Sequence, residues 1–227
     1  SYYFSKLFQK VIHCEITKSI SEIAAHNFKQ LAILNIETIS ENGLEYLKKS
    51  TEIFDVIYID PSRRNDVKEK VFLLKDCEPN IPENIDLLFK KTKTILLKNS
   101  PILDITSAIN ELKFVKEIHV VAINNDVKEL LYILEKGYCK EILIKTINFT
   151  KNNAQKFHFN YHKKPVSSYH EPLEYLYEPN AAVLKSGAFH EIRTQLNIFK
   201  LHQHSHLYKT KKRIEFPGRE FKIIAVL

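Results

Sequence analysis

Residues 54–66 read FDVIYIDPSRRND, and this stretch decides the fold class. Residues 54–60 form an apolar run with the length of one strand, which favours a strand buried on both faces of a sheet. The run ends on Asp60-Pro61, because proline cannot continue a strand ladder. Arg63 and Arg64 follow directly. We expect an active-site loop at the carboxyl edge of a parallel sheet; an ordinary strand end with turn residues is the alternative.

Short apolar runs and runs with helical spacing alternate on both sides of this stretch. The expected strands are residues 11–16, 36–40, 54–60, 94–101 and 117–123. The expected helices are residues 1–10, 18–33, 43–49, 83–91, 104–113 and 126–137. Residues 140–149 and 154–161 are expected to close the region as an antiparallel pair. The alternation predicts an α/β fold with a mostly parallel sheet that helices cover on both faces.

Four polar residues fall at or just after the ends of predicted strands: Glu15, Asn42, Asp60 and Ser100. Parallel sheets bind ligands outside the carboxyl ends of their strands. An acid in the position of Glu15 accepts hydrogen bonds from a ribose diol in nucleotide-binding sheets. The alternative is a solvated acid that the dipole of the following helix favours.

The composition changes after residue 161. Residues 162–172 read as a polar linker, and residues 173–227 read as a small α+β unit. Residues 1–150 hold 21 Lys+Arg against 21 Asp+Glu, whereas residues 151–227 hold 13 against 6. The whole excess of positive charge therefore lies in the last third, which favours RNA as a partner of that unit.

The run KTKKR supplies Lys209, Lys211, Lys212 and Arg213, which could contact phosphates. A solvated hairpin loop is the alternative. Three histidines stand at alternate positions, His202, His204 and His206, and would share one face of a strand. Acids and cysteines are missing around them, so we expect a polar strand face and no metal site.

Three cysteines without CxxC spacing indicate neither a disulfide framework nor a zinc site. The start of the chain lacks the features of a signal peptide, and no apolar run approaches the roughly 20 residues of a membrane span. We therefore expect a cytoplasmic protein without a membrane partner. The chain starts at Ser1 and contains no methionine, which favours a processed or excised segment. The oligomeric state is not indicated.

The order of Glu15, Asn42 and Asp60-Pro61 resembles the class I S-adenosylmethionine-dependent methyltransferases. The resemblance implies that Glu15 and Ile16 hold the ribose of the cofactor and that Asn42 lies beside its adenine. It also implies that Asp60-Pro61 forms the methyl-transfer site, with Asp60 facing both the cofactor and the acceptor.

Three stretches of sequence resemble a smaller group within this superfamily: IDPSRR (59–64), LLKNSPILD (96–104) and YEPNAAVLKSGAFHEI (177–192). Together they look like bacterial methyltransferase-like proteins with a ferredoxin-like segment and a C-terminal THUMP-like domain. THUMP domains bind RNA, so the resemblance implies transfer or ribosomal RNA as substrate. Its contacts are then expected at Arg63, Arg64 and Ser100 and at the basic run. The resemblance predicts an incomplete methyltransferase domain over residues 1–161, the linker, and a ferredoxin-like or THUMP-like unit over residues 173–227.

The chain departs from the superfamily at its start. The glycine-rich loop that follows the first strand is missing, since the first glycine is Gly43. We therefore expect a sheet without its first strand, truncation at the N-terminus and also at the C-terminus, and cofactor binding that needs the upstream loop. The segment alone is expected to be inactive.

RNA uracil-C5 methyltransferases share the Asp-Pro loop but need a cysteine nucleophile after the fifth strand, where this chain reads Lys98-Asn99-Ser100-Pro101. Nitrogen or oxygen methylation of RNA is thus the expected activity of the parent protein. An inactive RNA-binding module with a methyltransferase-like fold is the first alternative. A methyltransferase for a small molecule is the second.

Overall fold

The computed structural model describes residues 1–63, 73–161, 173–202 and 204–225. The chain divides into two compact units, Ser1–Phe54 and Asp55–Leu227. We call them the N-terminal unit and the main unit. The expected linker, residues 162–172, lies outside the described residues. No helix among the described residues is long and apolar enough to cross a membrane.

The N-terminal unit pairs two short parallel strands with three helices. Its elements are α1 (Tyr2–Ser5), β1 (Val11–Cys14), α2 (Lys18–Gln30), β2 (Ile36–Ile39) and α3 (Gly43–Lys49). The strands run in register from Val11 opposite Ile36 to Cys14 opposite Ile39. The expected helix over residues 1–10 is confined to the four residues of α1. Among the described side chains of this unit, only Ser21 and Leu47 are buried.

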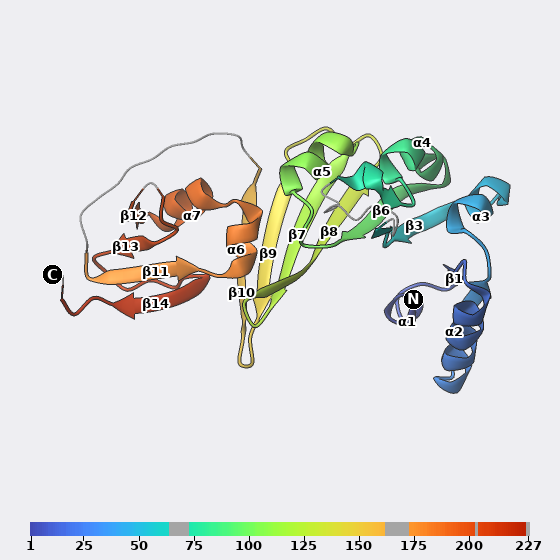
Figure 1. The fold of residues 1–227 in the computed structure, drawn as a ribbon, viewed down its shortest axis with the longest axis horizontal. Coiled ribbons are helices and arrows are strands. Elements are labelled where there is room, and N and C mark those ends of the chain that lie inside the picture. The colour runs from blue at the N-terminus through green and yellow to red at the C-terminus, as the bar shows by residue number, and fades with distance from the viewer. Residues whose placement is uncertain (64–72, 162–172, 203, 226–227) are drawn as a thin grey trace. The chain divides into compact units, whose positions relative to one another are not determined.

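The main unit is built on a six-stranded sheet in the order β10-β9-β7-β8-β6-β3 (Figure 1). The strands are β3 (Phe54–Ile59), β6 (Thr92–Asn99), β7 (Val115–Ile123), β8 (Asp126–Glu135), β9 (Leu143–Phe149) and β10 (Ala154–Asn160). Strands β6, β7 and β9 run in one direction, whereas β8 and β10 run against them. This arrangement confirms the α/β class and the expected antiparallel pair at the end of the region. The expected lack of a first strand stays a prediction.

The helix predicted for residues 126–137 is wrong, because this segment is strand β8. Its apolar run fits helical spacing, but side chains alternate between buried and half-buried, with Leu130, Tyr132 and Leu134 on the buried face. The strand lies between β6 and β7 and hydrogen-bonds to both. Pairing on two sides outweighs the local helical preference.

Strand β3 is also less buried than predicted. Residues 54–60 were expected to be covered on both faces, yet Tyr58 is 42% exposed. The reason is position, since β3 is the last strand of the six-stranded sheet among the described residues. An edge strand lacks the second neighbour that would cover it.

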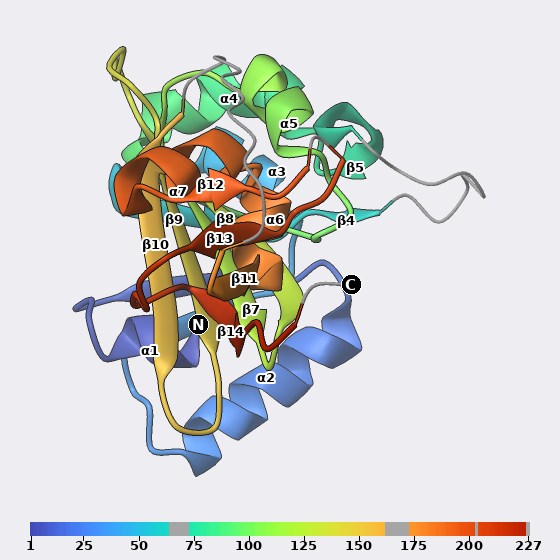
Figure 2. The ribbon, with the colours of Figure 1, turned by 90° about the vertical axis from the view of Figure 1, so that its left-hand side faces the viewer.

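A continuous row of buried side chains crosses the sheet. It runs through five strands over Leu97, Tyr132, Ile118, Ile144 and Phe159, each at most 5% exposed. Between β3 and β6 lie β4 (Ser62–Arg63), the 3-10 helix η1 (Leu74–Asp76), β5 (Cys77–Glu78) and α4 (Ile81–Lys91). α4 packs on β6, and α5 (Ile105–Glu111) packs on η1. Figure 2 shows α4 and α5 at the top of the view, and both helices contact η1. Asn80 and Asp104 cap the two helices through their side chains.

The chain ends in a four-stranded sheet in the order β12-β13-β11-β14. Its elements are β11 (Tyr175–Pro179), α6 (Ala181–Ser186), α7 (Phe189–Leu196), β12 (Phe199–Lys200), β13 (Tyr208–Thr210) and β14 (Gly218–Lys222). Gly187 ends α6 with a φ of 73°, a backbone conformation that glycine adopts without strain.

Amide side chains connect this C-terminal sheet to β9 and β10. Gln155 Oε1 accepts hydrogen bonds from Asn148 Nδ2 and Asn180 Nδ2, both at 3.1 Å. Gln155 Nε2 donates to the Gly218 carbonyl at 2.8 Å. Asn148 and Asn180 are each 3% exposed, so the hydrogen bonds that both donate to Gln155 offset the cost of burying two amides.

Candidate active site

Asp60 lies at the carboxyl end of β3, as the sequence predicts, and forms an ion pair that the sequence analysis missed. Its Oδ2 lies 2.7 Å from Nζ of Lys98, the penultimate residue of β6. The side chains are 47% and 31% exposed, so the pair faces solvent. The hydrogen bond from Lys98 to Asp60 raises the pKa of the lysine above its usual 10.5, and the attraction of the carboxylate adds to this. Lys98 is therefore a cation at neutral pH.

Two further ionisable groups act on this pair. Lys98 stands opposite Leu131 in the β6–β8 ladder, and Glu129 precedes Leu131 by two residues on the same face of β8. The antiparallel direction places Glu129 toward the carboxyl end of β6. Burial, followed by the charge of Asp60, raises the pKa of Tyr58, which precedes Asp60 by two residues on β3. Tyr58, Asp60, Lys98 and Glu129 thus form one electrostatic cluster, which we call the Asp60 cluster.

Strand β6 ends on a buried polar side chain. Asn99 is 2% exposed, and neither its Oδ1 nor its Nδ2 has a hydrogen-bond partner among the residues that the structure describes. An unsatisfied buried amide costs about 1–3 kcal/mol. The next residue, Ser100, is half-buried, and its Oγ accepts a hydrogen bond from the Ile102 backbone at 3.4 Å. The carboxyl end of β6, next to the Asp60 cluster, therefore carries polar side chains, whereas the middle of the strand carries buried apolar ones.

The segment after Pro61 forms a two-residue strand, β4, that pairs with β5. Ser62 lies opposite Glu78 and Arg63 opposite Cys77. The structure places the backbone of Arg63 but does not describe its side chain. Arg64 lies outside the described residues, so its expected contact with substrate stays a prediction.

The residues expected to bind the cofactor lie in the N-terminal unit. Glu15 follows β1, and its Oε1 accepts a hydrogen bond from the Thr17 backbone at 2.8 Å. Asn42 follows β2 and caps α3 through a hydrogen bond from Leu44 N to Oδ1 at 2.9 Å. The Glu15 backbone N–H donates to Ile39 O, so the carboxyl ends of both strands meet.

This geometry fits the adenosine half of a nucleotide. The second carboxylate oxygen of Glu15 can accept from a ribose diol, and the Asn42 NH₂ group can donate to a ring nitrogen. Ile16, expected beside the ribose, is 68% exposed and can supply an apolar contact. The N-terminal unit therefore holds Glu15, Ile16 and Asn42. The other expected site residues at strand ends, Asp60, Pro61 and Ser100, belong to the main unit.

The basic run divides into one buried and three exposed residues. Lys209 is 0% exposed within β13, so its expected contact with a phosphate does not fit the structure. The cause is the position of β13 between β12 and β11, where all three of its residues are buried. Lys211, Lys212 and Arg213 are exposed after β13, and Arg213 Nε lies 2.7 Å from Glu220.

The three alternate histidines do not share a strand face, because β13 begins only at Tyr208. Among the described residues, no group of three or more histidine, cysteine, aspartate or glutamate side chains could hold a metal ion.

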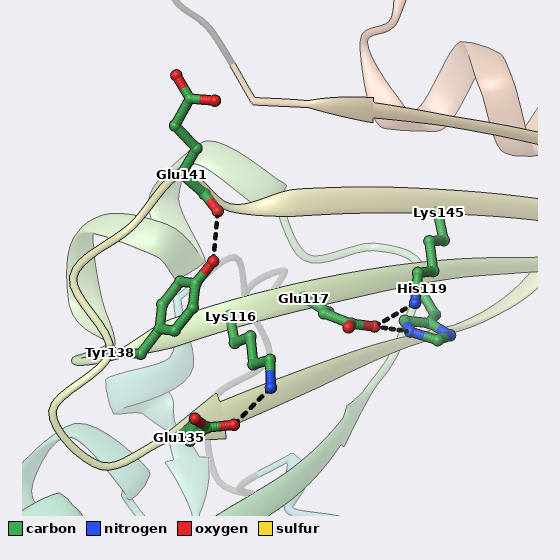
Figure 3. A network of polar contacts seen from close by, with 7 residues as sticks. All are labelled: Lys116, Glu117, His119, Glu135, Tyr138, Glu141 and Lys145. Atoms are coloured by element: carbon green, nitrogen blue, oxygen red, sulfur yellow. Dashed lines mark hydrogen bonds and ion pairs between the residues drawn. The ribbon is translucent and has the colours of Figure 1, made fainter.

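A second charged cluster lies on β7 and β9, near the amino ends of these strands (Figure 3). Glu117 Oε2 lies 2.6 Å from Lys145 Nζ and 2.9 Å from His119 Nε2. Burial favours a raised pKa for Glu117, but hydrogen bonds from Lys145 and His119 outweigh it, so the pKa is lowered. Within this cluster, Lys145 and His119 pair with the carboxylate of Glu117, which indicates a structural role.

Two members of the Asp60 cluster were missed for identifiable reasons. Lys98 interrupts an apolar strand next to its end, and that signal was available in LLKNSP. Glu129 was hidden because its segment was predicted as a helix, where no strand face could be assigned.

Comparison with known proteins agrees with this architecture. A family model described as a ferredoxin-like domain matches residues 175–217. The chain is similar to the crystal structure of a candidate methyltransferase from Porphyromonas gingivalis W83, with 30% sequence identity and a TM-score of 0.84. The alignment covers 96% of this chain and 56% of that protein, so the chain spans just over half of its length. A search among curated proteins finds no match.

The class that fold and comparison define is a Rossmann-like α/β protein with a methyltransferase fold, followed by a small antiparallel unit. The ferredoxin-like match falls within the expected C-terminal unit, residues 173–227.

Proposed function

We propose that the chain is part of an S-adenosylmethionine-dependent methyltransferase that modifies transfer or ribosomal RNA. One observation carries the proposal: Asp60-Pro61 ends a strand of a methyltransferase fold and holds its carboxylate beside a lysine at the carboxyl edge. A methyltransferase mainly positions its acceptor in line with the donor methyl group, and a fixed carboxylate can orient an acceptor hydrogen.

The residues of the N-terminal unit support the cofactor. Glu15 and Asn42 offer an acceptor and a donor at the ends of adjacent parallel strands, where such sheets bind nucleotides. When bound, the cofactor supplies an electrophilic methyl group. The protein supplies the contacts that hold its adenosine half.

Two observations support RNA as substrate. The excess positive charge lies in residues 151–227, and Lys211, Lys212 and Arg213 are exposed there. Clustered lysine and arginine side chains bind phosphates through ion pairs and released counterions. The ferredoxin-like match covers the same part of the chain.

The first test is calorimetry with S-adenosylmethionine on residues 1–227 and on the complete protein from the same reading frame. We expect only the complete protein to bind, because the glycine-rich loop expected upstream completes the cofactor site. Binding by neither protein would contradict the cofactor assignment and favour an inactive RNA-binding module. Tight binding by residues 1–227 would contradict the expected need for the loop.

The second test is the Asp60→Ala variant of the complete protein. We expect methyl transfer to RNA to fall by roughly 100-fold, the loss typical of removing a positioned acid–base group. Asp55→Ala is the matched control, because Asp55 is an exposed aspartate of the same strand. Equal rates for Asp60→Ala and Asp55→Ala, with equal melting temperatures, would remove Asp60 from the proposed site.

The third test concerns RNA binding. We expect Lys211, Lys212 and Arg213 changed together to glutamine to weaken binding and reduce the slope of log K against log salt by about 0.7 per lost contact. Lys90, Lys93 and Lys140 changed to glutamine are the control, because they are exposed lysines outside the C-terminal unit. An unchanged slope in the first triple variant would favour a small-molecule methyltransferase.

A further inference from the structure

Three charged side chains from adjacent strands meet on one face at the carboxyl edge of the sheet. Asp60 comes from the end of β3, Lys98 from β6 and Glu129 from β8. The pair Asp60–Lys98 is direct, at 2.7 Å, and Glu129 lies one step further along the face beyond Leu131. The cation therefore stands between two carboxylates next to the proposed methyl-transfer loop.

The charge states of these groups limit their roles. Lys98 keeps its proton at neutral pH, since the hydrogen bond with Asp60 and the charges of Asp60 and Glu129 all raise its pKa. It can stabilise negative charge but cannot accept a proton. Asp60 and Glu129 are the groups of the cluster that can accept one. Tyr58 also faces the cluster, and its raised pKa keeps its hydroxyl protonated.

A cation beside the acceptor discriminates between acceptor atoms. A neutral amine that attacks a methyl group becomes positively charged, and a neighbouring ammonium ion destabilises that charge. A hydroxyl that attacks gives up its proton, and the oxygen gains negative charge, which an ammonium ion stabilises. The arrangement around Lys98 therefore favours oxygen over an amine nitrogen.

We propose that the acceptor is a ribose hydroxyl of RNA that lies beside the ion pair and hydrogen-bonds to both the Lys98 ammonium group and the Asp60 carboxylate. The inference rests on the proposed function and names its acceptor atom. Within an RNA strand, the 2′-hydroxyl is the hydroxyl available at each internal nucleotide. The acceptor oxygen forms a bond with the donor methyl carbon as the carbon–sulfur bond breaks, and the electron pair of that bond stays on sulfur. The hydroxyl proton passes to Asp60.

The experiment identifies the methylated product. The complete protein is incubated with tritium-methyl-labelled S-adenosylmethionine and unmodified transfer and ribosomal RNA, and the RNA is hydrolysed with alkali. Alkaline cleavage needs a free 2′-hydroxyl, so we expect the label in alkali-resistant dinucleotides. Label in mononucleotides, as base methylation gives, would overturn this inference and leave the RNA methyltransferase intact. No label on RNA despite cofactor binding would overturn both.

Variants of Lys98 test the role of the cation. We expect Lys98→Met to reduce methyl transfer by roughly 100-fold, as the loss of one stabilising donor does, and Lys98→Arg to retain most of the rate. The rate of Lys98→Met should rise more steeply with pH than that of the wild type, because ionisation of the hydroxyl then lacks its counter-charge. Calorimetry should show unchanged cofactor binding.

Lys93→Met is the matched control, because Lys93 is exposed on the same strand at its other end. It should leave the rate and its pH profile unchanged. A wild-type rate and pH profile in Lys98→Met would overturn the assignment of Lys98.

Discussion

The two units of the chain share one kind of local sequence pattern but differ sharply in burial. The N-terminal unit, residues 1–54, forms its strands and helices with two buried side chains. Of the 15 large hydrophobic side chains that are exposed among the described residues, it carries eight: Tyr3, Leu7, Ile16, Ile20, Ile23, Leu31, Leu34 and Ile53. The main unit buries a row of apolar residues across five strands. Local pattern and capping are thus enough to define elements, whereas a core requires layers that face each other.

Hydrogen exchange gives the largest expected effect and can break this comparison. Amides of β1 in the N-terminal unit should exchange at least roughly 1,000-fold faster than those of Ile118 and Val120 in β7, since local opening is easy where few apolar contacts are lost. Exchange followed by mass spectrometry or NMR on the intact chain checks this. Equal protection in β1 and β7 would show that burial does not separate the two units.

Replacing single apolar residues with alanine tests the difference in packing between the two units. Leu130→Ala removes a 0%-exposed side chain of β8 and should lower the free energy of unfolding by about 3 kcal/mol. Ile23→Ala removes a side chain of α2 that is 59% exposed, and should change it by less than about 0.5 kcal/mol. Urea unfolding measures both. A similar loss in the two variants would contradict the difference in packing.

A substitution at Asn99 tests whether the polar residues of the candidate site lower the stability of the main unit. Asn99→Leu replaces an unsatisfied buried amide with an apolar group of similar size, so we expect a gain of about 1 kcal/mol in the free energy of unfolding. Asn152→Leu, at an exposed position, is the control and should give no gain. Destabilisation by Asn99→Leu would indicate that the amide supports the folded state.

Acid titration gives the smallest effect, below about 1 kcal/mol for a partly exposed ion pair. The pKa of Glu117 is lower in the folded than in the unfolded state, so its stabilisation is complete above pH 4.5 and is lost as the pH falls through the folded value. The melting temperature of Glu117→Gln should therefore lie below that of the wild type near neutral pH and converge with it in acid. Glu45→Gln, which removes an exposed pair with Lys48 in the N-terminal unit, should show the same trend at a smaller amplitude, because the hydrogen bond from Lys48 lowers the pKa of Glu45 but water screens the exposed pair. A constant offset for Glu117→Gln at all pH values would assign its effect to packing.

The sequence predicts most elements because their signals are local. The helix expected at residues 43–49 is α3, and the strand expected at residues 117–123 lies within β7. The failures are non-local. β8 became a strand because two neighbours pair with it, and Lys209 became buried because β13 lies between β12 and β11 in its sheet.

The residues of the candidate site also divide into those with a local sequence signal and those that depend on non-local pairing. Asp60 and Pro61 could be chosen from the sequence, since they end a strand. Lys98 has a local signal as a polar residue near the end of an apolar strand, but its pairing with Asp60 and the nearness of Glu129 could not be predicted, because the order of strands in the sheet creates them.

Strand β8 also determines when the sheet can assemble during synthesis. β6 and β7 leave the ribosome one after the other, yet neither pairs with the other, since β8 separates them. The two halves of the sheet can join only after residue 135 has emerged, so the strands already made wait with unpaired edges. Such edges are prone to aggregation in slowly forming sheets. The vulnerable interval of this chain is therefore the translation of residues 124–135, and a pause there would lengthen it.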